Sequence, residues 1–292
     1  MYELVQLTEN DYYIQSPAKI GLVKLNDSEV CLIDSGSDKE AGRKVRQLLD
    51  AKGWELKAIY NTHSNADHIG GNRYLQSQTG CKIYSMGAER AFTEFPLLEP
   101  SFLYGGYPMS ELRHKFLMAQ ESEVLPLTEK ALPECLEMIR LAGHFFDMTG
   151  FITKDGTFYM ADCLSSKETL DKYGIGFIYD VEEYLKTLQT VKTVKAKIFV
   201  PSHAEATDDI TALADYNILK VGEISDRIID ICAAPINFEG ILQKLFFAYS
   251  LKMTFEQYAL VGSTVRSYLA YLKEMGRIEA EFKDNMLLWK AV

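Results

Sequence analysis

The sequence lacks any run of about 18 apolar residues, the length at which a segment becomes a candidate membrane-spanning helix. It opens with MYELVQLTENDYYI, which has no basic residue before its apolar positions, so we expect no signal peptide. Its five cysteines are scattered, with no CxxC pair among them. This pattern argues against a disulfide framework and a cysteine zinc site, and it favours reduced core thiols in a cytoplasmic protein. Internal repeats and low-complexity segments are also missing.

The chain carries no excess of positive charge. Its formal net charge is −10, which argues against a protein that coats nucleic acid and makes a nucleic-acid partner an unfavoured reading. From residue 217 onward there are nine basic and nine acidic residues, so the first 216 residues carry the whole excess. A hydrophobic content of 47% is ordinary for a globular protein, and 292 residues suffice for one large domain with a smaller one.

Strand and helix patterns alternate along the first 208 residues. Strands come first and are followed by a strand–helix–strand alternation, which predicts two packed sheets with helices outside them. Strand patterns lie at 20–25, 30–34, 56–60, 81–85, 136–142, 150–160 and 197–200, and helical patterns lie at 38–52, 72–78 and 181–192. We therefore expect an α/β domain over residues 1–208 and a mostly helical domain over residues 209–292.

The last 39 residues combine helical patterns with a hairpin pattern. A helix at 254–261, a Gly-Ser-Thr break and a helix at 265–275 precede alternating residues at 277–289. This order resembles a winged-helix module. One reading is contact with nucleic acid through basic residues of the segment, namely Arg266, Lys273 and Arg277. The balanced charge favours the other reading, a small packing or dimerisation appendage.

Residues 91–120 interrupt the regular pattern. Three prolines, two adjacent glycines and six aromatic residues fit neither one strand nor one helix. Long irregular insertions of this kind are often lids or binding loops, so the segment would face a substrate or a second subunit, or wrap the surface. From this aromatic insertion we take Tyr104 and His114 as candidate substrate-binding residues, together with Tyr173 from a glycine-flanked loop.

The chain has only five histidines, and two of them lie in NTHSNADHIGGN at 61–72. His63, Asn65, Asp67 and His68 follow a strand pattern and precede two glycines, which allow a sharp bend. Imidazole and carboxylate groups are the ligands that zinc and similar divalent ions bind. The spacing therefore predicts a loop that curls around a cation.

Three further ionisable residues each follow an apolar run. His144 ends the run before it, Asp162 follows Phe158 to Ala161, and His203 follows Phe199 and Val200. Residues that leave the ends of neighbouring strands gather along one edge of a sheet, so we expect these three to meet the 63–68 cluster.

Taken together, the pattern His63-x-Asn65-x-Asp67-His68, then His144, Asp162 and His203, resembles the ordered metal ligands of the metallo-β-lactamase superfamily. The family's usual first motif is HxHxDH. Residues 32–36, LIDSG, resemble the strand and turn that precede it. The resemblance covers about residues 15–205. It implies an αββα sandwich of two mixed β-sheets flanked by helices, with the metal site at one edge.

Carried across position by position, the resemblance implies two metal positions. The first metal would be bound by His63, residue 65 and His144, and the second by Asp67, His68 and His203, with Asp162 bridging. Residue 65 is asparagine, whose amide oxygen is a weaker donor than imidazole. We therefore expect one tightly bound Zn²⁺, a second only at high metal concentration, and iron or manganese as alternative metals.

The expected function is a metal-dependent hydrolase in which a metal-bound hydroxide attacks a small ester, thioester, amide or phosphodiester. Asp67 is the candidate catalytic residue because it would orient the hydroxide as well as bind metal. Two alternatives stay open at this stage: a metal-binding regulatory or nucleic-acid-binding protein in which Asn65 marks weakened catalysis, and an iron-dependent redox variant of the same fold. A homodimer is compatible with each of these functions.

Overall fold

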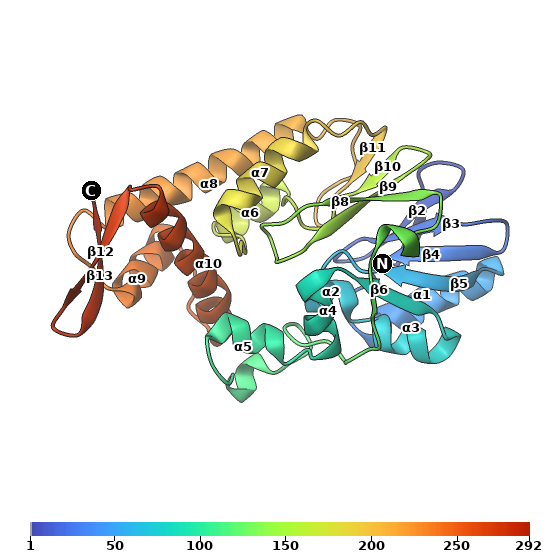
Figure 1. Ribbon diagram of the computed structural model, residues 1–292, viewed down its shortest axis with the longest axis horizontal. Helices are drawn as coiled ribbons and strands as arrows, with labels where there is room; N and C mark the ends of the chain where they lie inside the picture. The colour runs from blue at the N-terminus through green and yellow to red at the C-terminus, as the bar shows by residue number, and fades with distance from the viewer. Residues whose placement is uncertain (1) are drawn as a thin grey trace.

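The computed structural model describes residues 2–292 and contains two mixed sheets packed face to face (Figure 1). The first sheet has seven strands in chain order, antiparallel through the first four and parallel from the fourth onward. These strands are β1 (Glu3–Gln6), β2 (Asp11–Gln15), β3 (Ile20–Lys24), β4 (Glu29–Ile33), β5 (Glu55–Tyr60), β6 (Lys82–Ser85) and β7 (Leu125–Pro126). Parallel pairing from β4 onward directs the ends of β4 and β5 to the same edge.

The second sheet has four strands in the order β11-β10-β9-β8. They are β8 (Leu136–Arg140), β9 (Thr149–Thr153), β10 (Thr157–Tyr159) and β11 (Ile198–Val200). The single strand predicted at 150–160 is wrong, because the chain reverses at Gly156 (φ 99°) and forms the hairpin β9–β10. Gly21 lets the two sheets approach closely, since a Cβ there would lie 2.8 Å from the ring of Tyr159.

Helices cover the outer face of each sheet. On the first sheet, α1 (Lys39–Lys52) buries Val45 and Leu49 against strand residues and packs beside α3 (Asn72–Thr79). Its first turn is capped by Asp38, and it ends at Gly53 in the left-handed conformation. On the second sheet, α7 (Val181–Val191) packs Leu188 and Val191 into one cluster with Phe158 and Phe199, whereas α6 (Lys167–Tyr173) contacts α8 (Thr211–Ile231). The arrangement confirms the predicted αββα sandwich.

The C-terminal region is helical and ends in a hairpin, at the opposite end of the molecule from β4 and β5 (Figure 1). It contains α8 (Thr211–Ile231), α9 (Phe238–Ala248), α10 (Phe255–Glu274), β12 (Ile278–Lys283) and β13 (Met286–Ala291). One hydrophobic cluster runs from Phe158 and Leu188 into Ile224, Leu245 and Tyr268. The core is thus continuous across residue 208, and the predicted domain boundary there stays a prediction.

The break predicted at Gly262-Ser263-Thr264 is wrong, because α10 is one continuous helix of 20 residues. Gly262 and Thr264 are buried within it, and the Thr264 hydroxyl donates to the carbonyl of Leu260 one turn earlier. Burial against the neighbouring helices therefore offsets the low helix propensity of glycine. Within residues 2–292, no helix combines the length and the apolar character needed to cross a membrane.

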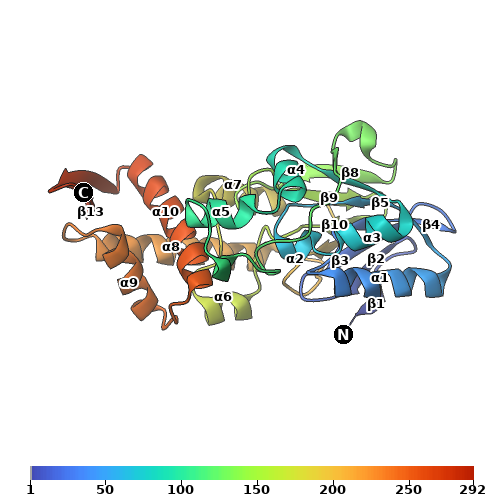
Figure 2. The same ribbon diagram turned by 90° about the horizontal axis from the view of Figure 1, so that it is seen from below.

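The aromatic insertion forms short helices that pack against α10. It begins within α4 (Gly87–Glu94) and contains α5 (Leu98–Tyr104) and the 3₁₀ turn Ser110–Leu112. Leu103, Leu112 and Leu117 form a small apolar cluster with Ala259 of α10. Figure 2 shows α5 beside α10 after a quarter turn of the molecule. The insertion therefore joins the sandwich to the C-terminal helices within one chain.

Candidate metal centre

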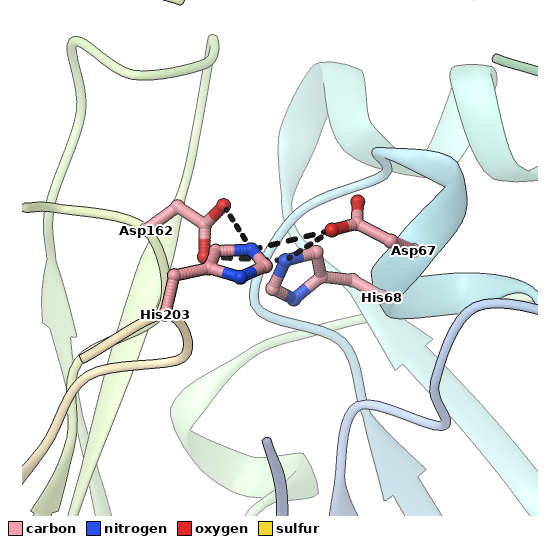
Figure 3. Close-up of side chains that lie close together, drawn as sticks. All are labelled: Asp67, His68, Asp162 and His203. Carbon is pink, nitrogen blue, oxygen red and sulfur yellow. Dashed lines mark ion pairs between the residues drawn. The ribbon is translucent and has the colours of Figure 1, made fainter. Parts of the chain in front are cut away.

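The residues predicted as ligands converge at one edge of the two sheets. His63 lies in the loop after β5, and Asp67 and His68 belong to the short helix α2 (Ala66–Ile69). His144, Asp162 and His203 follow β8, β10 and β11. Figure 3 shows Asp67 and His68 on one side and Asp162 and His203 on the other. Each sheet therefore contributes donors to a shared space between them.

Asp67, His68, Asp162 and His203 form the first of two clusters whose donor atoms all lie within 4.8 Å of one another. His203 Nε2 is 3.2 Å from Asp67 Oδ2 and 3.2 Å from Asp162 Oδ2. His68 Nε2 is 3.2 Å from Asp162 Oδ1 and 3.8 Å from Asp67 Oδ2. These four are the residues expected to bind the second metal.

The second cluster consists of His63, His144 and Asp162. The His63 ring lies 4.1 Å from that of His68 and 5.2 Å from that of His144, measured between centroids. Asn65 joins this group through its amide oxygen, which is 3.2 Å from His144 Nε2. Asp162 belongs to both clusters, in the place expected of a bridging ligand.

A buried carboxylate, Asp34, sets which nitrogen of two histidines faces the site. Its Oδ2 accepts hydrogen bonds from His68 Nδ1 at 2.8 Å and from the Thr62 hydroxyl at 2.7 Å. Because that hydroxyl donates to Asp34, it accepts from His63 Nδ1, 2.9 Å away. His68 and His63 therefore both donate through Nδ1 and direct Nε2 into the site. His203 follows the same rule, with Nδ1 3.0 Å from the carbonyl of Pro17.

The residues present fit a divalent cation. His63 Nε2 and His68 Nε2 are buried and have no hydrogen-bond partner among the described residues, and neither has Asp162 Oδ1. The 3.2 Å approach of His68 Nε2 to Asp162 Oδ1 lacks the alignment of a hydrogen bond. Buried polar atoms are rarely left unpaired, and Nε2 of a deprotonated imidazole is a suitable metal ligand. The donor set contains only nitrogen and oxygen, which leaves the identity of the metal open.

Electrostatics within the cluster separate the histidines into two kinds. Burial lowers the pKa of His63 and His144, so both are neutral donors near pH 7. Burial also opposes the charged form of His68, but Asp162, Asp67 and Asp34 outweigh it and raise its pKa well above the usual value. Asp162 is the main cause that raises the pKa of His203 to about 10. A divalent cation would therefore displace protons from His68 and His203 when it binds.

The pKa values of the two carboxylates, Asp67 and Asp162, are lowered by the neighbouring histidines. Burial raises the pKa of Asp67, but His68 and His203 outweigh burial and lower it to about 2. The pKa of Asp162 is held well below its usual value, because His203 and His68 outweigh the cost of burial. Both carboxylates are therefore ionised at neutral pH, as metal ligation requires.

Two residues next to the site have left-handed backbones that side chains other than glycine rarely adopt. Asp34, at the end of β4, has φ 64°, and Ala161, directly before Asp162, has φ 54°. The Asp34 side chain also accepts from the backbone N–H of Thr62 at 2.8 Å, which ties the end of β4 to the loop after β5. Backbone strain of this kind is typical of functional sites, where surrounding contacts hold it in place.

A second buried carboxylate, Glu89 of α4, accepts hydrogen bonds from the loop that carries His63 and Asn65, here called the motif loop. Its Oε2 accepts from the backbone N–H of Ser64 at 2.9 Å and from the Ser64 hydroxyl at 2.6 Å, and its Oε1 accepts from the N–H of Asp147 at 2.8 Å. Ser64 lies between His63 and Asn65, and Asp147 lies just after His144. Glu89 thus connects the loops that carry donors from the two sheets.

Glu89 should make the stability of the protein depend on pH. Burial raises its pKa from 4.5 to about 7 in the folded state. A raised folded pKa means that its stabilising contribution is complete below pH 4.5 and is lost as the pH rises through about 7. Between pH 5 and pH 8, the free energy of unfolding of the wild type should fall by about 2 kcal/mol relative to Glu89→Gln. Urea unfolding of both proteins in chelator measures this difference, and parallel pH profiles would contradict it.

The three predicted substrate-binding residues lie elsewhere in the fold. Tyr104 ends α5 and lines a cavity of about 810 Å³ between the insertion, α7 and α10. His114 lies 3.4 Å from Glu256 of α10. Tyr173 ends α6 and is half exposed, with Lys172 above its ring. Within residues 2–292, no hydrogen bond, ion pair or ring contact joins these three to the metal-ligand clusters, so their role in substrate binding stays a prediction.

Sequence reasoning assigned no role to several residues that shape the site. Asp34 belongs to the LIDSG segment, whose resemblance to the family's pattern could have indicated that this residue has a role in the site. Thr62, Glu89 and Glu99 carried none, because each acts through contacts that only the folded chain creates. Phe177 was missed as well, and its ring packs edge-on against His144 with centroids 5.4 Å apart.

Comparison with known proteins agrees with this geometry. The sequence model of the metallo-β-lactamase superfamily matches residues 15–203, more than half of the chain. The chain belongs to the metallo-β-lactamase superfamily. The match contains His63, Asp67, His68, His144, Asp162 and His203 and ends at the last of them.

Curated members of the superfamily match shorter stretches. A hydroxyacylglutathione hydrolase from Methylococcus capsulatus is 40% identical over 53 residues, which are 18% of this chain and 21% of the relative. A β-lactamase-like protein 2 homolog from Drosophila melanogaster is 23% identical over 194 residues, which are 64% of this chain and 59% of the relative. The chain thus spans less than two thirds of the length of each.

Solved structures of the superfamily match the whole fold. A β-lactamase domain protein from Burkholderia ambifaria superposes with a TM-score of 0.76 at 14% identity, covering 99% of this chain and 94% of that protein. A metallo-β-lactamase family protein from Thermus thermophilus gives 0.71 at 17% identity, covering 100% and 98%. These superpositions include the C-terminal helices, so the shared fold extends beyond the sandwich.

Proposed function

We propose that the protein is a metal-dependent hydrolase of a small thioester or ester. The observation that carries the proposal is the convergence of four imidazoles and two carboxylates, with Nε2 of His63 and His68 buried and unpartnered. A bound divalent cation supplies Lewis acidity and can lower the pKa of water from 15.7 to about 7. The seven predicted donors, Asn65 included, all line this space, and they are the residues that would hold the metal.

Asp67 is the residue best placed to handle the attacking water. Its side chain is 39% exposed and that of His203 is 29% exposed, whereas His63 and His68 are fully buried. Substrate would therefore approach the site from the side of Asp67 and His203. The Asp67 carboxylate would accept a hydrogen bond from the water and orient its oxygen toward the acyl carbon. The water oxygen would bond to the acyl carbon, the carbon–sulfur or carbon–oxygen bond would break, and one proton of the water would pass to the leaving thiolate or alkoxide, giving the carboxylic acid and the thiol or alcohol.

The choice of an acyl substrate rests on chemistry and on the relatives together. The matched relatives include hydroxyacylglutathione hydrolases from Methylococcus capsulatus and Erythrobacter litoralis, whose names describe thioester cleavage. The chain's net charge of −10 opposes polyanionic substrates. Phe177 against His144 adds an apolar wall suited to a short acyl chain.

The test is hydrolysis of small acyl thioesters and esters by the zinc-loaded protein. Thioester cleavage, followed with a thiol-reactive dye, should be saturable and should fall to the uncatalysed rate after chelation, because the ligands alone supply no nucleophile. Adding zinc back should restore it.

Two controls separate this activity from its alternatives. A phosphodiester probe should show no turnover, and His203→Ala should lose thioesterase activity, because His203 is a predicted ligand on the exposed side of the site. Phosphodiester cleavage without thioester or ester cleavage would reject the proposed substrate class. Unchanged turnover after complete removal of metal would reject the proposed reaction.

A further inference from the structure

Glu99 brings a buried carboxylate from the aromatic insertion to the motif loop. It lies in the first turn of α5 and is only 5% exposed. Its Oε1 accepts a hydrogen bond from Asn65 Nδ2 at 2.8 Å. Asn65 is also the position at which the chain departs from the superfamily's HxHxDH pattern. The residue that replaces a histidine is therefore bonded to a carboxylate 34 positions later in the chain.

This bond fixes which end of the Asn65 amide faces the metal-ligand clusters. Glu99 Oε1 is the acceptor of this bond, so the amide nitrogen points toward Glu99. The amide oxygen then points the other way, where it lies 3.2 Å from His144 Nε2. The oxygen is the end of the amide that can bind a cation. If the amide were reversed, two N–H groups would face the ion.

The two metal positions also differ in charge. The second position has Asp67 in addition to the shared Asp162. The first position has His63, His144 and Asn65, which are all neutral, and shares only Asp162. Glu99 lies directly behind Asn65. Burial raises the pKa of Glu99 well above its usual value, so what Glu99 contributes here is the hydrogen bond that orients the amide, and no fixed negative charge.

We propose that Glu99 is a positioning residue for the first metal position: it holds Asn65 so that the amide oxygen replaces the missing imidazole nitrogen. The aromatic insertion thereby compensates for the departure from HxHxDH. The inference rests on the metal centre of the proposed function, but not on any particular substrate.

Zinc titration against a chromophoric chelator tests the proposal without recourse to activity. The wild type should show a strong and a weak binding step, and His63→Ala should identify the weak step by removing it. Glu99→Ala, which removes the acceptor of the Asn65 amide, should weaken that same step about tenfold and leave the strong step unchanged. Glu99→Asp should act in the same direction, because it keeps the carboxyl group but withdraws it from Asn65.

A double-mutant cycle shows whether Glu99 acts through Asn65. In an Asn65→Ala background, Glu99→Ala should cause no further loss, because the amide on which Glu99 acts is gone. Glu94→Ala is the matched control on the neighbouring helix, where the Glu94 side chain pairs with Arg90 at 2.9 Å. It should titrate like the wild type. Circular dichroism and thermal unfolding confirm that each variant is folded.

Three results would overturn the proposal. One is a Glu99→Ala variant that binds both ions like the wild type, and another is a full effect of Glu99→Ala in the Asn65→Ala background. The third is a wild type that binds one ion even in millimolar zinc, since Glu99 would then have no first position to serve. The hydrolase proposal fails separately: a wild type inactive on every acyl substrate, but with the expected titrations, removes the substrate class and leaves the role of Glu99 intact.

Discussion

Asp67→Asn is expected to lower kcat for thioester or ester hydrolysis about 10²–10⁴-fold, the usual contribution of a positioned general acid or base. The carboxylate is 39% exposed and lies beside His203, so it is the ionised group that an incoming water meets. An amide of the same size carries no charge and has one acceptor oxygen instead of two. Steady-state kinetics at saturating zinc measure the effect, so that a weaker metal site is not mistaken for a slower reaction.

The matched control for this variant is Asp50→Asn, which neutralises an exposed carboxylate of α1 that pairs only with Arg46. It should keep wild-type kcat and KM. Metal analysis of Asp67→Asn should accompany the kinetics. A variant that holds the same metal as the wild type and turns over at a near-normal rate would show that Asp67 is not the catalytic residue.

Asp34→Asn is expected to weaken zinc binding about 100-fold, at the upper end of the effects seen for groups that orient metal ligands. Asparagine tolerates the left-handed backbone at this position, φ 64°, so the substitution mainly replaces one carboxylate oxygen with an NH₂ group. That group cannot accept the hydrogen bonds of His68 Nδ1 and the Thr62 hydroxyl. Because Thr62 in turn orients His63, one substitution disturbs a ligand of each metal position.

Competition titration with a chelator measures this loss, and thermal unfolding should show a cost of about 1–3 kcal/mol for the buried donors left unpaired. Ser35→Ala is the control, since Ser35 is the buried neighbour whose hydroxyl reaches only the backbone carbonyl of His68. It should keep most of the zinc affinity. Equal losses in the two variants would show that general loosening of this loop, rather than the orientation of His68 and His63, sets the affinity.

The sequence was sufficient to predict the αββα sandwich and the edge at which the predicted ligands meet. Strand-exit positions are visible in sequence because an apolar run ends at a polar side chain, and His144, Asp162 and His203 all showed this pattern. The folded chain brings them to His63, Asp67 and His68. Strand pairing alone explains that convergence, and no side-chain detail was needed to expect it.

What could not be predicted depends on contacts between distant segments. Glu99 is one glutamate among many in the sequence, and only the packing of α5 against α10 places its carboxylate behind Asn65. The helix break at Gly262 was expected from local propensity, but burial of that turn against other helices overrides it. Aromatic side chains such as Tyr104 indicate an apolar surface without indicating what covers it. Their positions had to come from tertiary structure.

The close approach of the sheets at Gly21 and Tyr159 has a consequence for the chemistry at their edge. One sheet carries some of the donors and the other sheet carries the rest. The distance between the sheets therefore sets the distance between the two groups of donor atoms. A cation bound there would join the two layers. The packing of residues far from any donor atom would then influence which cation the site prefers.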